Sequence, residues 1–183
     1  MEIFKNKKIL ITGHTGFKGS WLSIWLTHLG AKVVGVSNNI VGSPSNFLVS
    51  EISKVVDDYR FDIRDEGAIK SLIERVQPDF VFHLAAQALV RPSYENPLET
   101  MSINAIGSAN VLDALRGLDK KVVAVMITSD KAYDNVEWVW GYRETDRLGG
   151  KDPYSSSKGM AELAIRCYIE SFFNSPDSNV RIG

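Results

Sequence analysis

Short runs of apolar, mostly β-branched residues recur along the chain, and polar or turn-rich stretches separate them. A continuous apolar run of this length is typical of a strand that is buried on both faces of a parallel sheet. The runs predict strands at 9–12, 32–37, 55–61, 79–86 and 122–128, and residues 179–182 begin a sixth.

The segments between these runs carry apolar residues at helical spacing. They predict helices at 21–29, which Gly30 closes, and at 66–76, 97–117 and 153–173, whereas the polar stretch 38–50 is expected to be a loop. Strands that alternate with helices predict a doubly wound α/β fold, with a parallel sheet and helices on both of its faces. Residues 1–183 are expected to form one domain of this kind.

Composition narrows the classes of function. A hydrophobic content of 44% with 23% charged residues is enough to bury a core, and the net charge of −1 favours neither nucleic acid nor an anionic membrane as partner. The single cysteine, Cys167, excludes a disulfide framework and a zinc site built from cysteines. The N-terminal segment MEIFKNKKILITG has too short an apolar run for a signal peptide or a membrane span, so we expect a cytoplasmic protein without a metal.

Three glycines, Gly13, Gly16 and Gly19, stand between the first predicted strand and the first predicted helix. Glycines at this spacing allow a tight turn, let the backbone approach a pyrophosphate, and let the helix pack closely on the strand. The unpaired N–H groups of the helix then face the phosphates. The pattern predicts a dinucleotide site, and the alternative is a purely structural turn.

The choice between NAD and NADP rests on weaker signals. An acid that binds the adenosine ribose normally follows the second strand, but here that strand ends in Ser37, Asn38 and Asn39. Asn38 can hydrogen-bond a ribose hydroxyl as a neutral partner. The absence of Arg from 31–50 favours NAD. Asp62 and Ile63 are placed to contact the adenine ring, and the alternative for Asp62 is an exposed acid in a turn.

Tyr154 and Lys158 lie four residues apart at the start of the last predicted helix, and therefore on one face of it. A tyrosine that acts as a base must lose its phenol proton, and a neighbouring ammonium and the helix N-terminus both favour the phenolate. Ser129 ends the strand before this helix. Together with a dinucleotide site, these three side chains predict hydride transfer at a carbon that bears a hydroxyl.

At this point the chain resembles the extended short-chain dehydrogenase/reductase family. The resemblance runs through all 183 residues, in the stretches GHTGFKG, DIRD, HLAAQ, ITSDK and YSSSK, with Asn104 in the middle helix. Within that family the chain is most similar to the sugar-nucleotide 4,6-dehydratases. Lys131 in place of the usual Glu, together with GHTGFKGSWL, GYRETDRLGG and DPYSSSKGMAE, is typical of the members that act on CDP-glucose.

The resemblance implies a reaction in three stages. Carbon 4 of the glucosyl group is oxidised with Tyr154 as base and NAD as hydride acceptor, water is lost across carbons 5 and 6, and the hydride returns to carbon 6. Asp130 is implied as the acid and Lys131 as the base of the dehydration, which requires a protonated Asp130 and a neutral Lys131. Burial favours both neutral forms. The alternative is an exposed salt bridge at the end of the strand.

The resemblance also implies the remaining contacts. Catalytic residues are Ser129, Asp130, Lys131, Tyr154 and Lys158. The cofactor is held by Tyr154 and Lys158 and by Gly13, Thr15, Gly16, Phe17, Lys18, Gly19, Asn38, Asp62, Ile63, Leu84, Ala85, Ala86 and Asn104. The sugar nucleotide is held by Gln87, Arg91 and Ser93. His83 is interpreted as a packed core residue, and Trp138 and Trp140 are either a lid or part of the packing of their loop.

Members of the family continue into a second, substrate-binding domain, which this chain lacks because it ends within the expected sixth strand. Two interpretations follow. The chain is the cofactor-binding part of a dehydratase acting on CDP-glucose, or it is a truncated, non-catalytic NAD-binding module. A sugar-nucleotide epimerase is the nearest alternative enzyme, and the adjacent Asp130 and Lys131 argue against it. The helices at 97–117 and 153–173 pair two subunits in this family, so a homodimer is expected.

Overall fold

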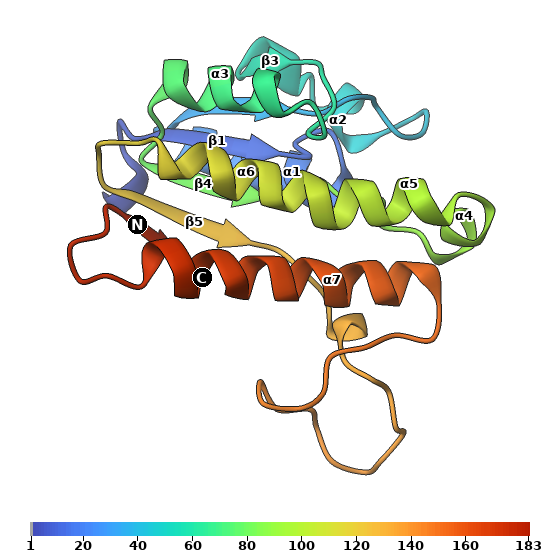
Figure 1. Cartoon of the computed structure of the whole chain (residues 1–183). Helices are drawn as coiled ribbons and strands as arrows, with labels where there is room; N and C mark the ends of the chain where they lie inside the picture. The colour runs from blue at the N-terminus through green and yellow to red at the C-terminus, as the bar shows by residue number, and fades with distance from the viewer. Residues whose placement is uncertain (1) are drawn as a thin grey trace.

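Six parallel strands form the centre of the computed structural model, which describes residues 2–183 (Figure 1). Their order across the sheet is β3-β2-β1-β4-β5-β6. The strands are β1 (Lys8–Thr12), β2 (Lys32–Val36), β3 (Asp57–Tyr59), β4 (Phe80–His83), β5 (Val122–Met126) and β6 (Val180–Ile182). This arrangement confirms the predicted doubly wound fold, although residue 1 of the predicted domain lies outside the described residues.

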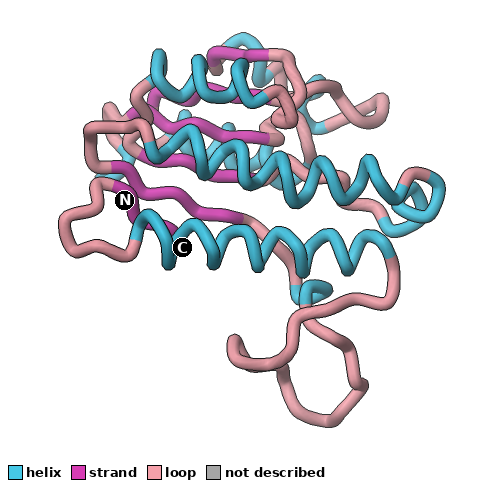
Figure 2. Tube along the Cα trace, viewed as in Figure 1, coloured by secondary structure: helices cyan, strands magenta, loops and turns pink. Residues whose placement is uncertain are grey.

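Helices cover both faces of the sheet, as Figure 2 shows in cyan. The α-helices are α1 (Phe17–His28), α2 (Asn46–Val49), α3 (Glu66–Val76), α4 (Val90–Glu95), α5 (Pro97–Met101), α6 (Gly107–Arg116) and α7 (Pro153–Tyr168). Short 3-10 helices are η1 (Glu2–Phe4), η2 (Ile52–Lys54) and η4 (Asp130–Ala132), and π-helical turns are η3 (Ser102–Ile106) and η5 (Ile169–Phe173). Among residues 2–183, none of these helices is long and apolar enough to cross a membrane.

The side chains of β1 alternate between two separate cores, one on each face of the sheet. Ile9 and Ile11 pack with Leu26 of α1 and Phe47 of α2. Leu10 points to the other face, into the larger core formed by α3, α6 and α7. A strand that is apolar at every position is therefore buried on both sides, which explains the unbroken apolar run in the sequence.

Four parts of the helix and strand prediction are corrected by the structure. The stretch 38–50 is not all loop, because the hydroxyl of Ser45 caps α2 at Leu48 N (3.3 Å) and Phe47 is buried. Strand β4 stops at His83 instead of residue 86. The amide of Ala85 turns to the Thr12 hydroxyl at 3.1 Å, which ends the ladder with β1. Helix α4 lies in a segment where none was predicted, and strand β5 ends at Met126 rather than at residue 128.

Candidate cofactor and active site

The glycine loop joins β1 to α1 at the carboxyl edge of the sheet. Gly13 has a positive φ of 76°, and a Cβ there would lie 2.7 Å from the backbone nitrogen of Ala85. A Cβ at Gly19 would lie 2.1 Å from the carbonyl oxygen of Gly13. Gly16 is the N-cap of α1 and offers no side chain to the first N–H groups of the helix. The glycine loop thus packs closely against the backbone of Ala85 and of Gly13 itself. The N-terminus of α1 remains available for an anion.

The other predicted residues of this loop point in different directions. The Thr15 hydroxyl donates a hydrogen bond to the carbonyl of Asn39 at 2.7 Å, which ties the loop to the end of β2. Phe17 is 75% exposed, and Lys18 is exposed beside it. Asn38 is exposed after β2. These three side chains are accessible to a ligand at the same edge of the sheet, and that of Asn38 also lies near Asp62.

His14, which the sequence did not single out, holds the glycine loop against β2 and β3. It is fully buried, its Nε2 lies 2.9 Å from Asp58 Oδ1, and its ring meets the ring of Phe47 edge-on. Burial is the main cause that lowers the pKa of His14, and the nearby Asp58 opposes it. A Cβ at Gly35 would lie 2.3 Å from the His14 ring. The glycine inside the predicted strand 32–37 was therefore the available signal of a close approach.

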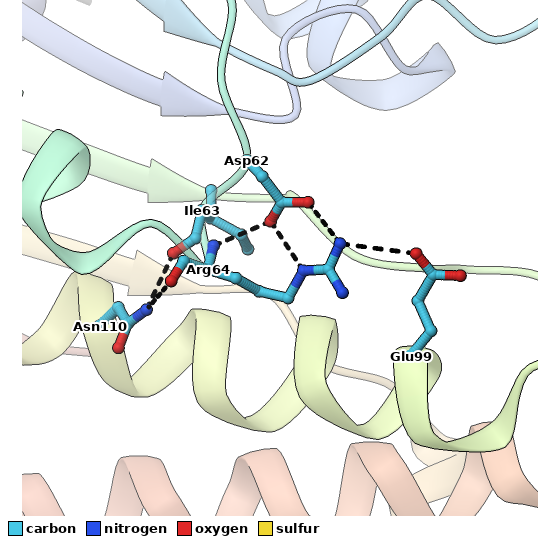
Figure 3. Close-up of polar contacts among 5 residues, drawn as sticks. All are labelled: Asp62, Ile63, Arg64, Glu99 and Asn110. Carbon is cyan, nitrogen blue, oxygen red and sulfur yellow. Dashed lines mark hydrogen bonds and ion pairs between the residues drawn. The ribbon is translucent and has the colours of Figure 1, made fainter.

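Asp62 is not a free acid in a turn, because Arg64 holds it (Figure 3). The Arg64 backbone N and Nε donate to Asp62 Oδ1 at 2.8 and 3.0 Å, and an Arg64 terminal nitrogen donates to Oδ2 at 2.7 Å. The Arg64 hydrogen bond is the main cause that lowers the pKa of Asp62, and the Asn38 side chain adds a smaller contribution. The side chain of Ile63 is buried against Gly107 of α6.

The segment after β4 connects the sheet to α7. His83 is buried, as expected for a core residue, with Nδ1 2.8 Å from the Thr12 hydroxyl and Nε2 3.0 Å from the Ser108 hydroxyl. Burial, and then the charge of Lys158, lower its pKa to about 3, so the ring is neutral at physiological pH. Leu84, Ala85 and Ala86 follow as half-buried residues directly behind the glycine loop.

Asn104 links this segment to α7. Its Oδ1 accepts from the backbone of Gln87 at 2.8 Å, and its Nδ2 donates to the Gln87 carbonyl at 3.0 Å and to the Ser157 hydroxyl at 2.7 Å. Asn104 lies in the π-helical turn η3, a distortion that is frequent at functional sites. Asn104 is therefore satisfied by the protein and acts on the site through the backbone that it holds.

The three predicted substrate residues differ in availability. The Gln87 side chain donates to the Leu89 carbonyl and the Thr100 hydroxyl, at 2.9 and 3.0 Å. Ser93 is buried, and its hydroxyl donates to the Val90 carbonyl at 2.6 Å. Arg91 is exposed on α4 and forms no ion pair within residues 2–183. Of the three, only Arg91 presents an uncommitted polar group.

Tyr154 and Lys158 lie one turn apart on α7, whose N-terminus is capped by Asp152 through Ser155 N at 2.9 Å. Lys158 is only 6% exposed, and burial is the main cause that lowers its pKa. Glu162 opposes this shift, whereas the positive charge of Lys18 adds to it. The charge of Lys18 at the start of α1 therefore acts on Lys158 of α7 across the same edge of the sheet.

Ser129, Asp130 and Lys131 form the turn that leads into η4. The Ser129 hydroxyl donates to Asp130 Oδ1 at 3.1 Å and accepts from the Lys131 backbone at 3.2 Å. The turn packs on α7, where Gly159 admits the backbone of Ala132. Asp130 and Lys131 are both exposed, and no ion pair joins them in the described residues. The roles implied for Asp130 and Lys131 require burial, and residues 2–183 do not bury these two side chains.

The loop between η4 and α7 extends away from the sheet (Figure 2). Tyr142 stacks on Tyr133 with ring centroids 5.3 Å apart, and Trp138 lies against Tyr142 at 5.6 Å. Trp140 is 72% exposed. Trp138 therefore packs within the loop, as one of the two expectations had it. Among residues 2–183, no cluster of three or more His, Cys, Asp or Glu side chains is arranged to hold a metal.

Comparison with known proteins shows that the chain is similar to sugar-nucleotide 4,6-dehydratases. A protein-family model described as GDP-mannose 4,6 dehydratase matches residues 10–179. The CDP-glucose 4,6-dehydratase of Salmonella typhimurium is 47% identical over 173 residues, which cover 94% of this chain and 48% of that protein. The GDP-mannose 4,6-dehydratase of Yersinia enterocolitica is 30% identical, over 91% of this chain and 46% of that protein. The chain spans about half the length of these relatives.

Solved structures share the fold. The UDP-glucose 4-epimerase of Thermus thermophilus, in complex with NAD, superposes with a TM-score of 0.75 at 31% identity, over 91% of this chain and 52% of that one. The UDP-glucose 4-epimerase of Thermotoga maritima, with UDP-glucose, gives a TM-score of 0.78 at 27% identity, over the same shares of the two chains. Both proteins extend well beyond the part that this chain matches.

Proposed function

The chain belongs to the GDP-mannose 4,6-dehydratase family, and from this premise we propose that it is the cofactor-binding part of an NAD-dependent sugar-nucleotide 4,6-dehydratase. The observation that carries the proposal is the packing of η4, which follows Ser129, on α7, the helix that carries Tyr154 and Lys158. An acid and an amine next to a serine and a tyrosine provide what oxidation followed by loss of water requires.

We propose CDP-glucose as the substrate and CDP-4-keto-6-deoxyglucose as the product. The 47% identity to a CDP-glucose 4,6-dehydratase supports this choice over GDP-mannose, for which the identity is 30%. Exposed Arg91 is the residue that we assign to the nucleotide-sugar phosphates, because its guanidinium is uncommitted. Gln87 acts on the substrate by shaping the turn before α4, and Ser93 by holding the first turn of α4 itself.

NAD is the cofactor that the residues fit best. The close backbone packing that Gly13 and Gly19 allow, and the N-terminus of α1, which no side chain caps, suit a pyrophosphate. Asn38 is a neutral partner for a ribose, and Asp62 with Ile63 is assigned to the adenine. The NAD complexes among related epimerases support the same assignment. When bound, NAD supplies the acceptor and later the donor of the hydride.

The chain's own groups then divide the proton transfers. Tyr154, as phenolate, takes the proton of the carbon 4 hydroxyl, and Ser129 hydrogen-bonds the oxygen at that carbon. Lys158 holds the nicotinamide ribose and favours the phenolate by its charge. Lys131 removes the proton from carbon 5, and Asp130 protonates the carbon 6 hydroxyl so that water leaves. Both groups are exposed, so bound substrate has to supply the burial that these roles require.

We further propose a homodimer in the cytoplasm. Apolar side chains on the outer faces of the two long helices are exposed, among them Leu98 at 81%, Ile106 at 55% and Leu163 at 56%. Exposed apolar side chains on these helices suit a helix–helix interface. Sedimentation of the chain tests this, and Leu163→Glu is expected to give monomers.

One observation favours a second candidate, a non-catalytic NAD-binding module. Asp130 and Lys131 lack the burial that their catalytic roles need within the described residues. The candidate predicts cofactor binding without turnover. An epimerase is disfavoured, because epimerisation has no use for an acid and a base next to Ser129.

Incubation of the chain with NAD and CDP-glucose, followed by mass spectrometry of the sugar nucleotide, separates these candidates. A product lighter by one water supports the dehydratase. Bound NAD without any product supports the non-catalytic module. Loss of NAD binding would contradict both.

A further inference from the structure

Arg64 joins the turn that carries Asp62 to the helix in front of it, as Figure 3 shows. Its guanidinium lies between two carboxylates: it binds both oxygens of Asp62, and a terminal nitrogen reaches Glu99 Oε1 of α5 at 3.5 Å. A planar guanidinium fixes the direction of a carboxylate in a way that a single ammonium does not. The plane of the Asp62 carboxylate is therefore set by Arg64.

The backbone of the same turn is held by α6. The Asn110 side chain donates to the carbonyl oxygens of Ile63 and Arg64, both at 3.1 Å. A Cβ at Gly107 would lie 2.5 Å from Ile63 Cδ1, so the isoleucine side chain fills the space that this glycine leaves. Carboxylate, backbone and side chain are thus each fixed by a separate contact.

The fixed orientation of the Asp62 carboxylate determines which hydrogen-bond donors of a ligand it can accept from. An ionised carboxylate has about four acceptor positions, of which Arg64 fills three, two on Oδ1 and one on Oδ2. Apart from Arg64, only the Asn38 side chain approaches the carboxylate, and no hydrogen bond from it lies within 3.5 Å in residues 2–183, so Oδ2 keeps an acceptor position. An ionised carboxylate has no hydrogen to donate. No acceptor within residues 2–183 takes the backbone N–H of Ile63. The turn therefore offers one acceptor and one donor side by side.

Adenine matches this pair, because its exocyclic amine donates and its ring N1 accepts. Hypoxanthine reverses both groups, since its carbonyl oxygen accepts and its N1–H donates. We propose that Arg64, fixed from α5 by Glu99, is a positioning residue that makes Asp62 select adenine over hypoxanthine at the purine end of the cofactor. The inference rests on the proposed function, since it assumes that NAD binds with its adenine at Asp62.

The test compares the affinity of the chain for NAD and for nicotinamide hypoxanthine dinucleotide, both measured by calorimetry. Wild type is expected to bind NAD about 10-fold more tightly, because hypoxanthine leaves the Asp62 and Ile63 groups unpaired. In Arg64→Ala the preference is expected to fall to about 2-fold, because the freed carboxylate can rotate away from the base. Arg64→Lys keeps the charge but not the planar fork, and is expected to behave nearly like Arg64→Ala.

Three controls keep the outcomes separate. Arg116→Ala removes a similar pair, with Asp113 at 2.6 Å, from the far end of α6, and is expected to leave the preference unchanged. Asp62→Asn can donate to hypoxanthine and should abolish the preference. Thermal melting of each variant shows whether it is folded.

The inference is overturned if folded Arg64→Ala or Arg64→Lys keeps the wild-type preference while Asp62→Asn loses it. In that case Asp62 reads the base without help from Arg64, and the proposed function stands. A wild-type chain that binds neither dinucleotide would instead contradict the proposed function, and the inference with it.

Discussion

Two acids follow strands at the same edge of the sheet, and the contacts that hold them differ. Asp62, after β3, accepts three hydrogen bonds from Arg64, and its pKa is lowered chiefly by them. Asp130, after β5, accepts one hydrogen bond from the Ser129 hydroxyl and is exposed. The first acid is locked as an ionised acceptor, whereas the second has no cation bound to it in the described residues.

The difference matches the two kinds of work that the site is proposed to do. A group that recognises a cofactor benefits from a fixed direction and a fixed charge. A group that delivers a proton has to change its charge during the reaction, which a bidentate guanidinium would oppose. We therefore expect the cofactor end to be complete within this chain, whereas the sugar end depends on what covers Asp130 and Lys131.

The largest effect is expected from Gly19→Ala, which disturbs the glycine loop at the cofactor end of the site. A Cβ at this position would lie 2.1 Å from the Gly13 carbonyl oxygen, so the helix has to move away from the loop. We expect a loss of about 3 kcal/mol in the free energy of unfolding and no measurable binding of NAD. Chemical denaturation and calorimetry measure the two effects. Gly141→Ala is the matched control, because nothing lies within 4 Å of its Cβ.

Tyr154→Phe is expected to separate cofactor binding from sugar oxidation, because it removes only the phenol that acts as base. NAD affinity is expected to stay within about 3-fold of wild type, while oxidation of the sugar falls by about 1000-fold. The nicotinamide absorbance after mixing with CDP-glucose reports the oxidation. Tyr168 lies on the same helix as Tyr154, and its hydroxyl is 3.3 Å from Asp113 of α6. Tyr168→Phe removes this hydroxyl and should leave the oxidation rate unchanged. Equal rates in Tyr154→Phe and wild type would remove Tyr154 from the mechanism.

Lys131→Met is expected to separate the oxidation of the sugar from the loss of water. Oxidation at carbon 4 is expected to proceed, but loss of water should slow by about 100-fold because no base removes the carbon 5 proton. Reduced nicotinamide should therefore accumulate without a lighter product. Lys121→Met, at an exposed position before β5, is the control. Dehydration at the normal rate in Lys131→Met would mean that another group is the base.

The smallest effect is expected at Lys158, which is buried on α7. Its folded pKa is lowered from 10.5, so the unfolded state binds more protons and stability rises with pH up to about 10.5. Lys158→Met should raise the free energy of unfolding by about 1 kcal/mol below the folded pKa. The gain should vanish above 10.5. Denaturation at several pH values measures it, with exposed Lys70→Met as control. A gain that is independent of pH would contradict the assigned cause.

The parts of the fold that local signals predict are those whose cause lies within a few residues. Helix α3 begins and ends at residues 66 and 76 as predicted, since Asp65 caps it at Ala68 N (2.9 Å) and Pro78 follows its end. Gly30, with a φ of 80°, closes α1 as expected. Helix α4, in a segment where no helix was predicted, has Pro92 in its first turn, where a proline costs little.

The parts that were missed depend on residues far apart in the sequence. The end of β4 is decided by the Thr12 hydroxyl, 73 residues away from Ala85. His14 contacts Asp58 across 44 residues, and Arg64 reaches Glu99 across 35. The exposure of Asp130 and Lys131 likewise follows from which segments pack on η4. Residue types predicted the chemistry of these groups, but only the tertiary structure sets their surroundings.

Titration of the 183-residue chain with NAD tests the central claim most directly, since that claim is that the cofactor end is complete in these residues. We expect saturable binding with one site per chain, retained in Tyr154→Phe and lost in Gly19→Ala. No saturable binding by wild type, or equal binding by folded Gly19→Ala, would contradict the account.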